Sequence, residues 1–284
     1  MQRFAAAALT LLASHAFALS PESEAKNQPV APFKIIDNIY YVGASDVTAY
    51  LFVTSKGMIL LDGGFAETAP QIEKNIASLG FKLSDVKILI NGHAHPDHAG
   101  GLAQLKRDTG ATFEAMAQEV QPLEHAGKGT FYRGEKDLFE SIPVDRTLHD
   151  GDTVKLGDTT LVAHLTAGHS PGCTTWTTTV KAGDKTLSAA FVCQLSLPAG
   201  QALVGNTFYP SIADDFKLTF STLAALPCDI FLAEHGRDYD LNVKIAKMKN
   251  TASTNPFIDP AGYRALIEKS RVEFEDALAE QRAK

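Results

Sequence analysis

One stretch decides how this chain is built and where its chemistry lies: Asn91-Gly92-His93-Ala94-His95-Pro96-Asp97-His98-Ala99-Gly100-Gly101. It places three histidines and one carboxylate within six residues, directly after the largely apolar run Val86-Lys87-Ile88-Leu89-Ile90. A neutral imidazole or a carboxylate offers Zn²⁺ a lone pair, and such side chains at a strand end can converge on one point. Four such donors exceed what one open catalytic zinc usually takes from a protein, so the stretch predicts a reaction centre with two metals.

Residues 1–18 have the features of a secretory signal peptide. Arg3 gives a short positive region, Phe4 to Leu12 form an apolar run, and Ala16-Phe17-Ala18 fits the small-x-small cleavage rule. The alternative is a membrane anchor, but the apolar run is shorter than the about 20 residues that cross a bilayer. We therefore expect export to the periplasm, with residues 19–284 forming a single domain.

The charge balance excludes one class of partner. Acidic residues outnumber basic ones by 33 to 26, the formal net charge is −7, and Lys and Arg do not cluster. Proteins that bind nucleic acids carry basic patches, so no nucleic-acid partner is expected. No apolar stretch after residue 18 is long enough to span a membrane. We expect a monomer that acts on a small molecule and has no membrane partner.

Strand-like and helix-like segments follow one another twice over, without a linker between the halves. Runs of β-branched and apolar residues predict strands at 33–42, 49–54, 58–61, 86–91, 111–117, 146–156, 159–166, 174–180, 186–192 and 229–233. Helical spacing predicts helices at 66–79, 101–109, 212–226 and 260–283, while 19–31 and 118–144 lack periodicity. This order fits an α/β fold of two packed sheets with helices outside, in which ligand-type residues follow the carboxyl ends of strands.

Two of the three cysteines are placed to form a disulfide. Cys173 and Cys193 lie symmetrically around Gly183, the middle of a turn between two strand-like arms. In simple hairpin register the two sulfurs fall on directly opposed residues, whereas a one-residue bulge would separate them. Because an exported chain permits disulfides, we predict a Cys173–Cys193 bridge, with Cys228 left to fill apolar space.

Two further histidines lie at strand ends. His169 occurs in Gly168-His169-Ser170-Pro171-Gly172, and His235 occurs in Ala233-Glu234-His235-Gly236. A lone histidine is more often a surface or core residue than a metal ligand, and this interpretation is kept for the remaining four, His15, His125, His149 and His164. His169 and His235 are the better candidates because strand ends followed by turn residues are common ligand positions in α/β folds.

Together, His93-x-His95-x-Asp97-His98, the later Gly168-His169 before Ser-Pro-Gly, and the strand-end His235 resemble the metallo-β-lactamase superfamily, from about residue 33 to about residue 240. The resemblance implies a four-layer αβ/βα sandwich with a di-zinc site at one edge of the two sheets. It implies that His93, His95 and His169 hold the first zinc. Asp97, His98 and His235 would hold the second zinc.

One position distinguishes among the hydrolases of this superfamily. Members such as glyoxalase II and lactonases usually carry an aspartate that bridges both metals, whereas the corresponding stretch here, Ala189 to Ser196, has no acidic residue. In this the chain is similar to true β-lactamases. One subclass of these places a cysteine on the second zinc, and Cys193 is a candidate, but that subclass lacks a histidine at the position of His98. The third subclass, with His98 present, fits better, and three further stretches resemble it: Gly168 to Trp176, Leu195 to Pro198, and Leu226 to Asp229.

The resemblance to the third subclass implies hydrolysis of the β-lactam amide bond of penicillins, cephalosporins and carbapenems by a zinc-bound hydroxide, and hence antibiotic resistance. Asp97 would orient the hydroxide, and Ser196 would hold the substrate carboxylate. Gln194, which stands where relatives often have serine, is also expected to contact the substrate. The rivals are another periplasmic di-zinc hydrolase, such as a lactonase or thioesterase, and a non-catalytic zinc protein, which would need further ligands.

Three more residues are assigned to the surroundings of the zinc ions. Phe131 and Tyr132 lie in the long loop-like segment, where they line the mouth of the cleft or pack against the base of their own loop. Asp62, in Leu61-Asp62-Gly63-Gly64, is expected to orient a zinc-bound histidine rather than to bind metal, because carboxylates commonly hydrogen-bond such rings.

Overall fold

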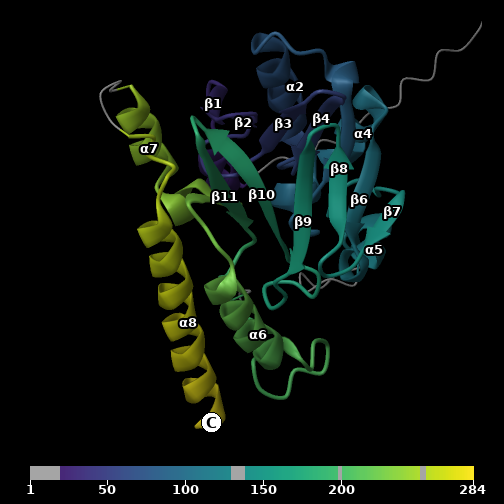
Figure 1. The fold of residues 1–284 in the computed structure, drawn as a ribbon. Helices are drawn as coiled ribbons and strands as arrows, with labels where there is room; N and C mark the ends of the chain where they lie inside the picture. The colour runs from purple at the N-terminus through teal and green to yellow at the C-terminus, as the bar shows by residue number, and fades with distance from the viewer. Residues whose placement is uncertain (1–19, 129–137, 198–199, 250–253) are drawn as a thin grey trace, which may run out of the picture.

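The computed structural model describes residues 20–128, 138–197, 200–249 and 254–284. The predicted signal peptide and the loop residues Phe131 and Tyr132 lie outside these ranges. Two mixed β-sheets face each other and carry helices on their outer sides (Figure 1). This arrangement confirms the predicted four-layer αβ/βα sandwich.

The N-terminal sheet has seven strands, which lie in the order of the chain. They are β1 (Phe33–Ile36), β2 (Ile39–Tyr41), β3 (Tyr50–Thr54), β4 (Gly57–Leu61), β5 (Val86–Ile90), β6 (Thr112–Met116) and β7 (Arg146–Leu148). β1 to β4 pair antiparallel, and β4 to β7 pair parallel. Because the carboxyl ends of parallel strands meet at one edge, Asp62 after β4 emerges beside the histidine stretch after β5.

The C-terminal sheet has five strands in the order β12-β11-β10-β9-β8. They are β8 (Thr153–Leu156), β9 (Thr159–Leu165), β10 (Thr174–Ala182), β11 (Lys185–Val192) and β12 (Ile230–Ala233). β8 to β11 pair antiparallel, and β12 pairs parallel with β11. The carboxyl ends of β9, β11 and β12 therefore lie at the same edge of this sheet.

Eight α-helices occur in the described residues. They are α1 (Pro21–Lys26), α2 (Ala69–Ser78), α3 (Pro96–Ala99), α4 (Leu102–Thr109), α5 (Ala117–Glu124), α6 (Ile212–Ala225), α7 (Leu241–Met248) and α8 (Pro260–Arg282). Figure 1 shows α2 and α4 on one side of the strands and α6 and α8 on the other. Within the described ranges, no helix combines the length and the apolar character that a membrane crossing requires.

Aromatic side chains tie the two sheets together. Tyr50 and Phe52 of β3 pack edge-on against Phe191 of β11, with ring centroids 4.9 and 5.0 Å apart. On its other face the N-terminal sheet is covered by buried side chains of α2 and α4, such as Ile72 and Leu102. Since both faces of this sheet are buried, the strands that carry the histidines are held at fixed positions.

Several predicted elements are interrupted or were missed. The predicted strand 33–42 breaks into β1 and β2 at Asp37, whose φ of 46° makes a turn, and the predicted strand 146–156 breaks at residues 149–152. α5 begins at Ala117 and runs into the stretch 118–144, α1 lies within 19–31, and α7 was not predicted at all. These helices have six to eight residues, too few for a clear apolar repeat, and α5 contains Pro122.

Cys173 and Cys193 form the predicted disulfide, with their Cα atoms 5.9 Å apart. The predicted hairpin register is wrong by one residue, because Ala182 pairs with Lys185 and the turn is Gly183-Asp184. Both cysteines lie one residue beyond the paired strands, where the chain no longer follows the register. Cys228 is free and partly buried against the core, as expected.

Candidate metal centre

Three loops bring the predicted ligands to one edge of the sandwich. The stretch His93–His98 follows β5, and α3 begins within it at Pro96. His169 lies between β9 and β10, and His235 follows β12. Thr174 N donates a 2.8 Å hydrogen bond to the carbonyl oxygen of Gly92, which joins the loop after β5 to the start of β10.

His93, His95 and His169 form the first cluster. Nδ1 of His95 lies 2.8 Å from Nε2 of His93 and 3.1 Å from Nε2 of His169. All three side chains are buried. Three nitrogens that converge in this way match the three protein ligands of an open zinc site.

Asp97, His98 and His235 form the second cluster. The Nε2 atoms of His98 and His235 lie 3.3 Å apart, and Oδ2 of Asp97 is 3.7 Å from each of them. The rings of His93 and His98 have centroids 4.5 Å apart, so the two clusters adjoin. The structure thus brings together all six residues that the sequence assigned to two metals, in the same two groups of three.

The outer nitrogen of four imidazoles meets an oxygen acceptor. Nδ1 of His98 lies 3.3 Å from Asp62 Oδ2, and Nδ1 of His169 lies 2.7 Å from the carbonyl oxygen of Ser196. The Nδ1 atoms of His93 and His235 likewise face carboxylates, Glu234 at 3.1 Å and Asp46 at 3.2 Å. An acceptor on Nδ1 keeps the proton there and leaves the Nε2 lone pair for a metal.

This tautomer pattern provides a test of whether a metal fits. With protons on the outer nitrogens of His93 and His169, their Nε2 atoms both face Nδ1 of His95, at 2.8 and 3.1 Å, and that nitrogen can donate a proton to only one of them. Lone pairs at this distance repel one another unless a cation lies between them. Buried imidazole and carboxylate donors of this kind suit Zn²⁺, so the residues present fit the metal that the family resemblance implies.

The two clusters differ in how readily they hold protons. Burial lowers the pKa of His169 to about 4, and it lowers the pKa values of His93 and His95 well below their usual range. Burial also lowers the pKa of His98, but Asp97, Glu234 and Asp62 outweigh it and raise that pKa to about 10. The second cluster therefore binds a proton near neutral pH, whereas the first does not.

Glu119, a buried residue of α5, has a role at this site that the sequence analysis did not predict. Its Oε2 accepts a 2.8 Å hydrogen bond from the backbone N of Ala94, between His93 and His95. Its Oε1 accepts hydrogen bonds from Ser170 Oγ at 2.6 Å and from Gly172 N at 2.8 Å, just after His169. Glu119 thus joins the two loops that carry the first cluster, and burial raises the pKa of its carboxyl group.

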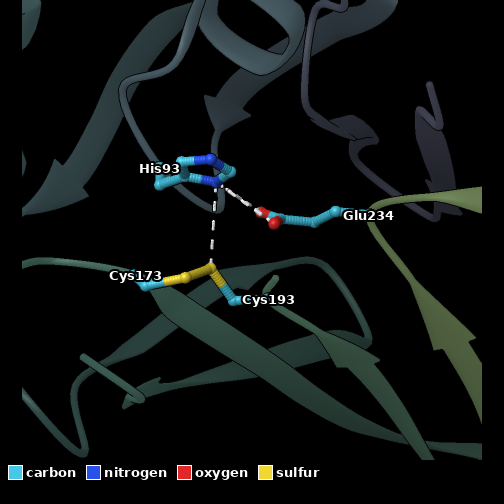
Figure 2. Close-up of side chains that lie close together, drawn as sticks. All are labelled: His93, Cys173, Cys193 and Glu234. Carbon is cyan, nitrogen blue, oxygen red and sulfur yellow. Dashed lines mark hydrogen bonds and ion pairs between the residues drawn. A yellow bond between two sulfur atoms is a disulfide. The ribbon is translucent and has the colours of Figure 1, made fainter. Parts of the chain in front are cut away.

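Glu234 is a second residue that the sequence analysis missed. Figure 2 shows that one nitrogen of the His93 ring, Nδ1, faces both the Glu234 carboxylate and the Cys173–Cys193 disulfide, with Cys193 Sγ 3.8 Å from that nitrogen. A Cβ on Gly92 would lie 1.4 Å from Glu234 Oε1, so only glycine leaves room for this carboxylate. Burial raises the pKa of Glu234, and a cation held by the clusters would oppose that shift.

The sequence contains little that would have identified the carboxylates of Glu234, Asp46 and Glu119 as parts of the site. Glu234 precedes His235 directly, but Asp46 and Glu119 are remote in sequence from the residues they contact. Asp46 also accepts a 2.8 Å hydrogen bond from Arg237 N, next to His235. Nothing in the spacing of Asp46 or Glu119 identifies them, because their roles depend on the packing of whole elements.

Two of the residues expected to meet substrate lie next to the clusters: Gln194 Oε1 is 3.1 Å from His235 Nε2, and the carbonyl oxygen of Ser196 is 2.7 Å from His169 Nδ1. Gln194 and Ser196 follow β11, and Gln194 Nε2 donates a 2.7 Å hydrogen bond to Ser196 Oγ. The histidines interpreted as surface or core residues lie outside both clusters where the structure describes them; His164 Nε2, for example, lies 2.8 Å from the hydroxyl of Thr177.

The chain belongs to the metallo-β-lactamase superfamily, since the model of that family matches residues 42–235. The match confirms the predicted family and spans both clusters. Among curated proteins, a probable metallo-hydrolase from Burkholderia pseudomallei is 32% identical over 127 residues, 44% of this chain and 42% of that protein. This chain therefore spans less than half the length of that relative.

Solved structures resemble the chain over nearly its whole length. The metallo-β-lactamase FEZ-1 from Legionella gormanii is 39% identical, with a TM-score of 0.88 over 91% of this chain and 99% of that one. The subclass B3 enzyme BJP-1 from Bradyrhizobium japonicum is 40% identical, with a TM-score of 0.84 over 91% and 97%. The class B3 di-zinc enzyme LRA-12 from an Alaskan soil metagenome is 32% identical, with a TM-score of 0.86 over 93% and 98%. These similarities confirm the predicted likeness to the third subclass.

Proposed function

We propose that this chain is a zinc-dependent β-lactamase of the third subclass, which opens the amide bond of penicillins, cephalosporins and carbapenems and so confers antibiotic resistance. The observation that carries the proposal is the pair of adjoining clusters at one edge of the sandwich. The similarity to β-lactamases of 39–40% identity over 91% of the chain supports it.

The chain would hold two zinc ions. His93, His95 and His169 would bind the first, and Asp97, His98 and His235 would bind the second. Bound zinc lowers the pKa of water towards about 7 and stabilises negative charge that develops on a substrate. Asp62, Asp46 and Glu234 would keep three of the imidazoles in the orientation and tautomer that bind metal.

Asp97 has a further function in this proposal. Although burial raises its pKa, the charges of His98, His235 and His95 outweigh burial and hold that pKa at about 2. Its side chain is one-quarter exposed, so the ionised carboxylate can accept a hydrogen bond from the attacking water and orient it towards the lactam carbonyl.

The substrate would lie over the two clusters. Ser196 is exposed, and its hydroxyl would bind the substrate carboxylate. The hydrogen bond from His169 to the Ser196 carbonyl oxygen fixes this segment relative to the first cluster. Phe131 and Tyr132, outside the described residues, would line the mouth of the cleft. We propose a monomeric, single-domain periplasmic enzyme, exported by residues 1–18, whose only partner is its small substrate.

Hydrolysis of a chromogenic cephalosporin by the purified protein tests the proposal. We expect turnover that a chelator abolishes and added Zn²⁺ restores, because both clusters need their metal. A lactone and a thioester, tested in parallel, should be cleaved far more slowly. No zinc-dependent cleavage of the cephalosporin by protein with two zinc ions per chain would refute the β-lactamase activity, and faster cleavage of the lactone or thioester would favour the rival hydrolases.

A further inference from the structure

The side-chain amide of Gln194 reaches the second cluster. Its Oε1 lies 3.1 Å from Nε2 of His235, the same nitrogen that faces His98 and Asp97. Two hydrogen bonds hold the residue in place: its backbone N donates to Glu234 Oε2 at 2.8 Å, and its Nε2 donates to Ser196 Oγ at 2.7 Å. With Nε2 directed at Ser196, the oxygen end of the amide faces the cluster.

The proton on His235 lies on the opposite side of its ring. Asp46 Oδ2 is 3.2 Å from Nδ1, and an ionised carboxylate only accepts hydrogen bonds. Arg237 Nη1 is also 3.2 Å from Nδ1, but it contacts Asp46 Oδ2 as well, and one carboxylate can accept from both groups. Nε2 of His235 therefore carries a lone pair.

The amide oxygen thus faces a nitrogen lone pair. Nε2 of His98 faces the same nitrogen at 3.3 Å, and it offers a lone pair once a metal displaces the proton that His98 holds. Oε1 of Gln194 and Nε2 of His98 thus lie 3.1 and 3.3 Å from Nε2 of His235, the spacing expected of ligands around one zinc ion whose bonds are about 2.0–2.2 Å long. A cation between them would satisfy all three atoms.

We propose that Oε1 of Gln194 is a fourth protein ligand of the second metal, one that substrate displaces. The inference rests on the two-metal site proposed above. Zinc with three protein ligands keeps a coordination position open for water or substrate. A neutral amide oxygen is a weaker donor than a carboxylate or an imidazole, so Gln194 would secure the resting metal and leave when substrate binds.

Three substitutions by side chains of similar size test whether Gln194 is a metal ligand or only a hydrogen-bonding residue. Gln194→Leu removes the oxygen, and Gln194→Glu replaces it with a charged donor of the same shape. We expect the affinity for the second metal to fall about tenfold in the leucine variant and to rise above native in the glutamate variant. Gln104→Leu, the same change on α4 away from the site, is the matched control and should bind both metals as the native chain does.

Metal binding is measured directly, without any substrate. Purified full-length protein is titrated with Zn²⁺ against a chromophoric chelator and, separately, with Co²⁺, whose visible absorption depends on its ligand set. The inference predicts native stoichiometry, a weaker second step in Gln194→Leu, and a changed spectrum for the second Co²⁺ in both Gln194 variants. A purely structural role would not produce the order Leu below Gln below Glu.

Two results would overturn the inference. Native second-metal affinity and an unchanged Co²⁺ spectrum in Gln194→Leu would show that Oε1 only accepts a hydrogen bond from His235. Binding of a single metal by the native chain would remove the second site altogether. If second-metal affinity follows the predicted order of the three side chains but the protein does not cleave the cephalosporin, only the β-lactamase activity is refuted, and Gln194 remains a metal ligand.

Discussion

The two clusters use the same imidazole chemistry in different electrostatic surroundings. Around the first, the outer contacts of His93 and His169 are one carboxylate, Glu234, and one backbone carbonyl, and the histidine pKa values are lowered. Around the second, two carboxylates face the imidazoles from outside, Asp97 faces them from inside, and the pKa of His98 rises to about 10.

Their mechanical support differs as well. Glu119 and the Cys173–Cys193 disulfide cross-link the loops that carry the first cluster. The second cluster depends on Asp62 after β4 and Asp46 before β3, side chains that orient rather than cross-link. The first cluster is therefore neutral and rigidly held. The second cluster attracts cations more strongly, but it must release a proton before it binds a metal ion.

The largest effect should follow from removing one ligand of either cluster. We expect His169→Ala and His235→Ala each to lower kcat/KM for a cephalosporin by more than about 100-fold, because even loss of an outer partner costs 10 to 100-fold. Steady-state kinetics with a zinc assay measure this. His164→Ala removes a histidine outside the clusters and should keep native activity. Full turnover in either ligand variant would exclude its cluster from the reaction.

Proton competition should separate the clusters next most strongly. A histidine whose pKa is raised stays protonated below that pKa, so a metal must displace the His98 proton at every pH below about 10. Second-cluster affinity should rise about tenfold per pH unit between about pH 6 and 8. First-cluster affinity should stay nearly flat there, because the pKa of His169 is about 4.

A variant that keeps only one intact cluster shows how the metal affinity of that cluster depends on pH. Chelator competition on His235→Ala reports the first cluster, and the same measurement on His169→Ala reports the second. Parallel slopes in the two variants would contradict the electrostatic difference between the clusters.

Loss of Glu119 should weaken only the first cluster. Glu119→Ala leaves three buried donors without an acceptor, so we expect unfolding to become easier by about 3 kcal/mol. First-metal affinity should fall about tenfold, while the second metal binds as before. Denaturant unfolding and chelator competition measure both. Glu124→Ala, an exposed glutamate of the same helix, is the control, and equal weakening of both metals would refute a specific role for Glu119.

The smallest effects should come from the orienting carboxylates of the second cluster. Asp62 is fully buried and also accepts a 2.9 Å hydrogen bond from Gly92 N, so Asp62→Asn should lower second-metal affinity about tenfold. Asp46 is 14% exposed at its side chain, so Asp46→Asn should cost less. Zinc titrations rank the two variants, and the reverse order would mean that burial does not set the strength of this support.

Much of the fold and the ligand set could be predicted from the chain alone. Apolar runs predicted the strands that the ligands follow. The His93–His98 stretch predicted a metal site because its donor residues are close together in the sequence. The disulfide was predicted correctly from a register that was wrong by one residue. The helix α5 was missed, and with it Glu119, because Pro122 and its eight residues hide any helical repeat.

The sequence by itself determined which atoms are available to bind metal: five imidazoles and the carboxylate of Asp97, at spacings that follow strand ends. Only the tertiary structure decided which nitrogen of each ring faces inward, because Asp46, Asp62, Glu234 and Ser196 reach the rings from other elements. It also decided that Gln194 faces the second cluster. A side chain's donors are fixed by its covalent chemistry, whereas its tautomer and orientation are fixed by neighbours that only folding supplies.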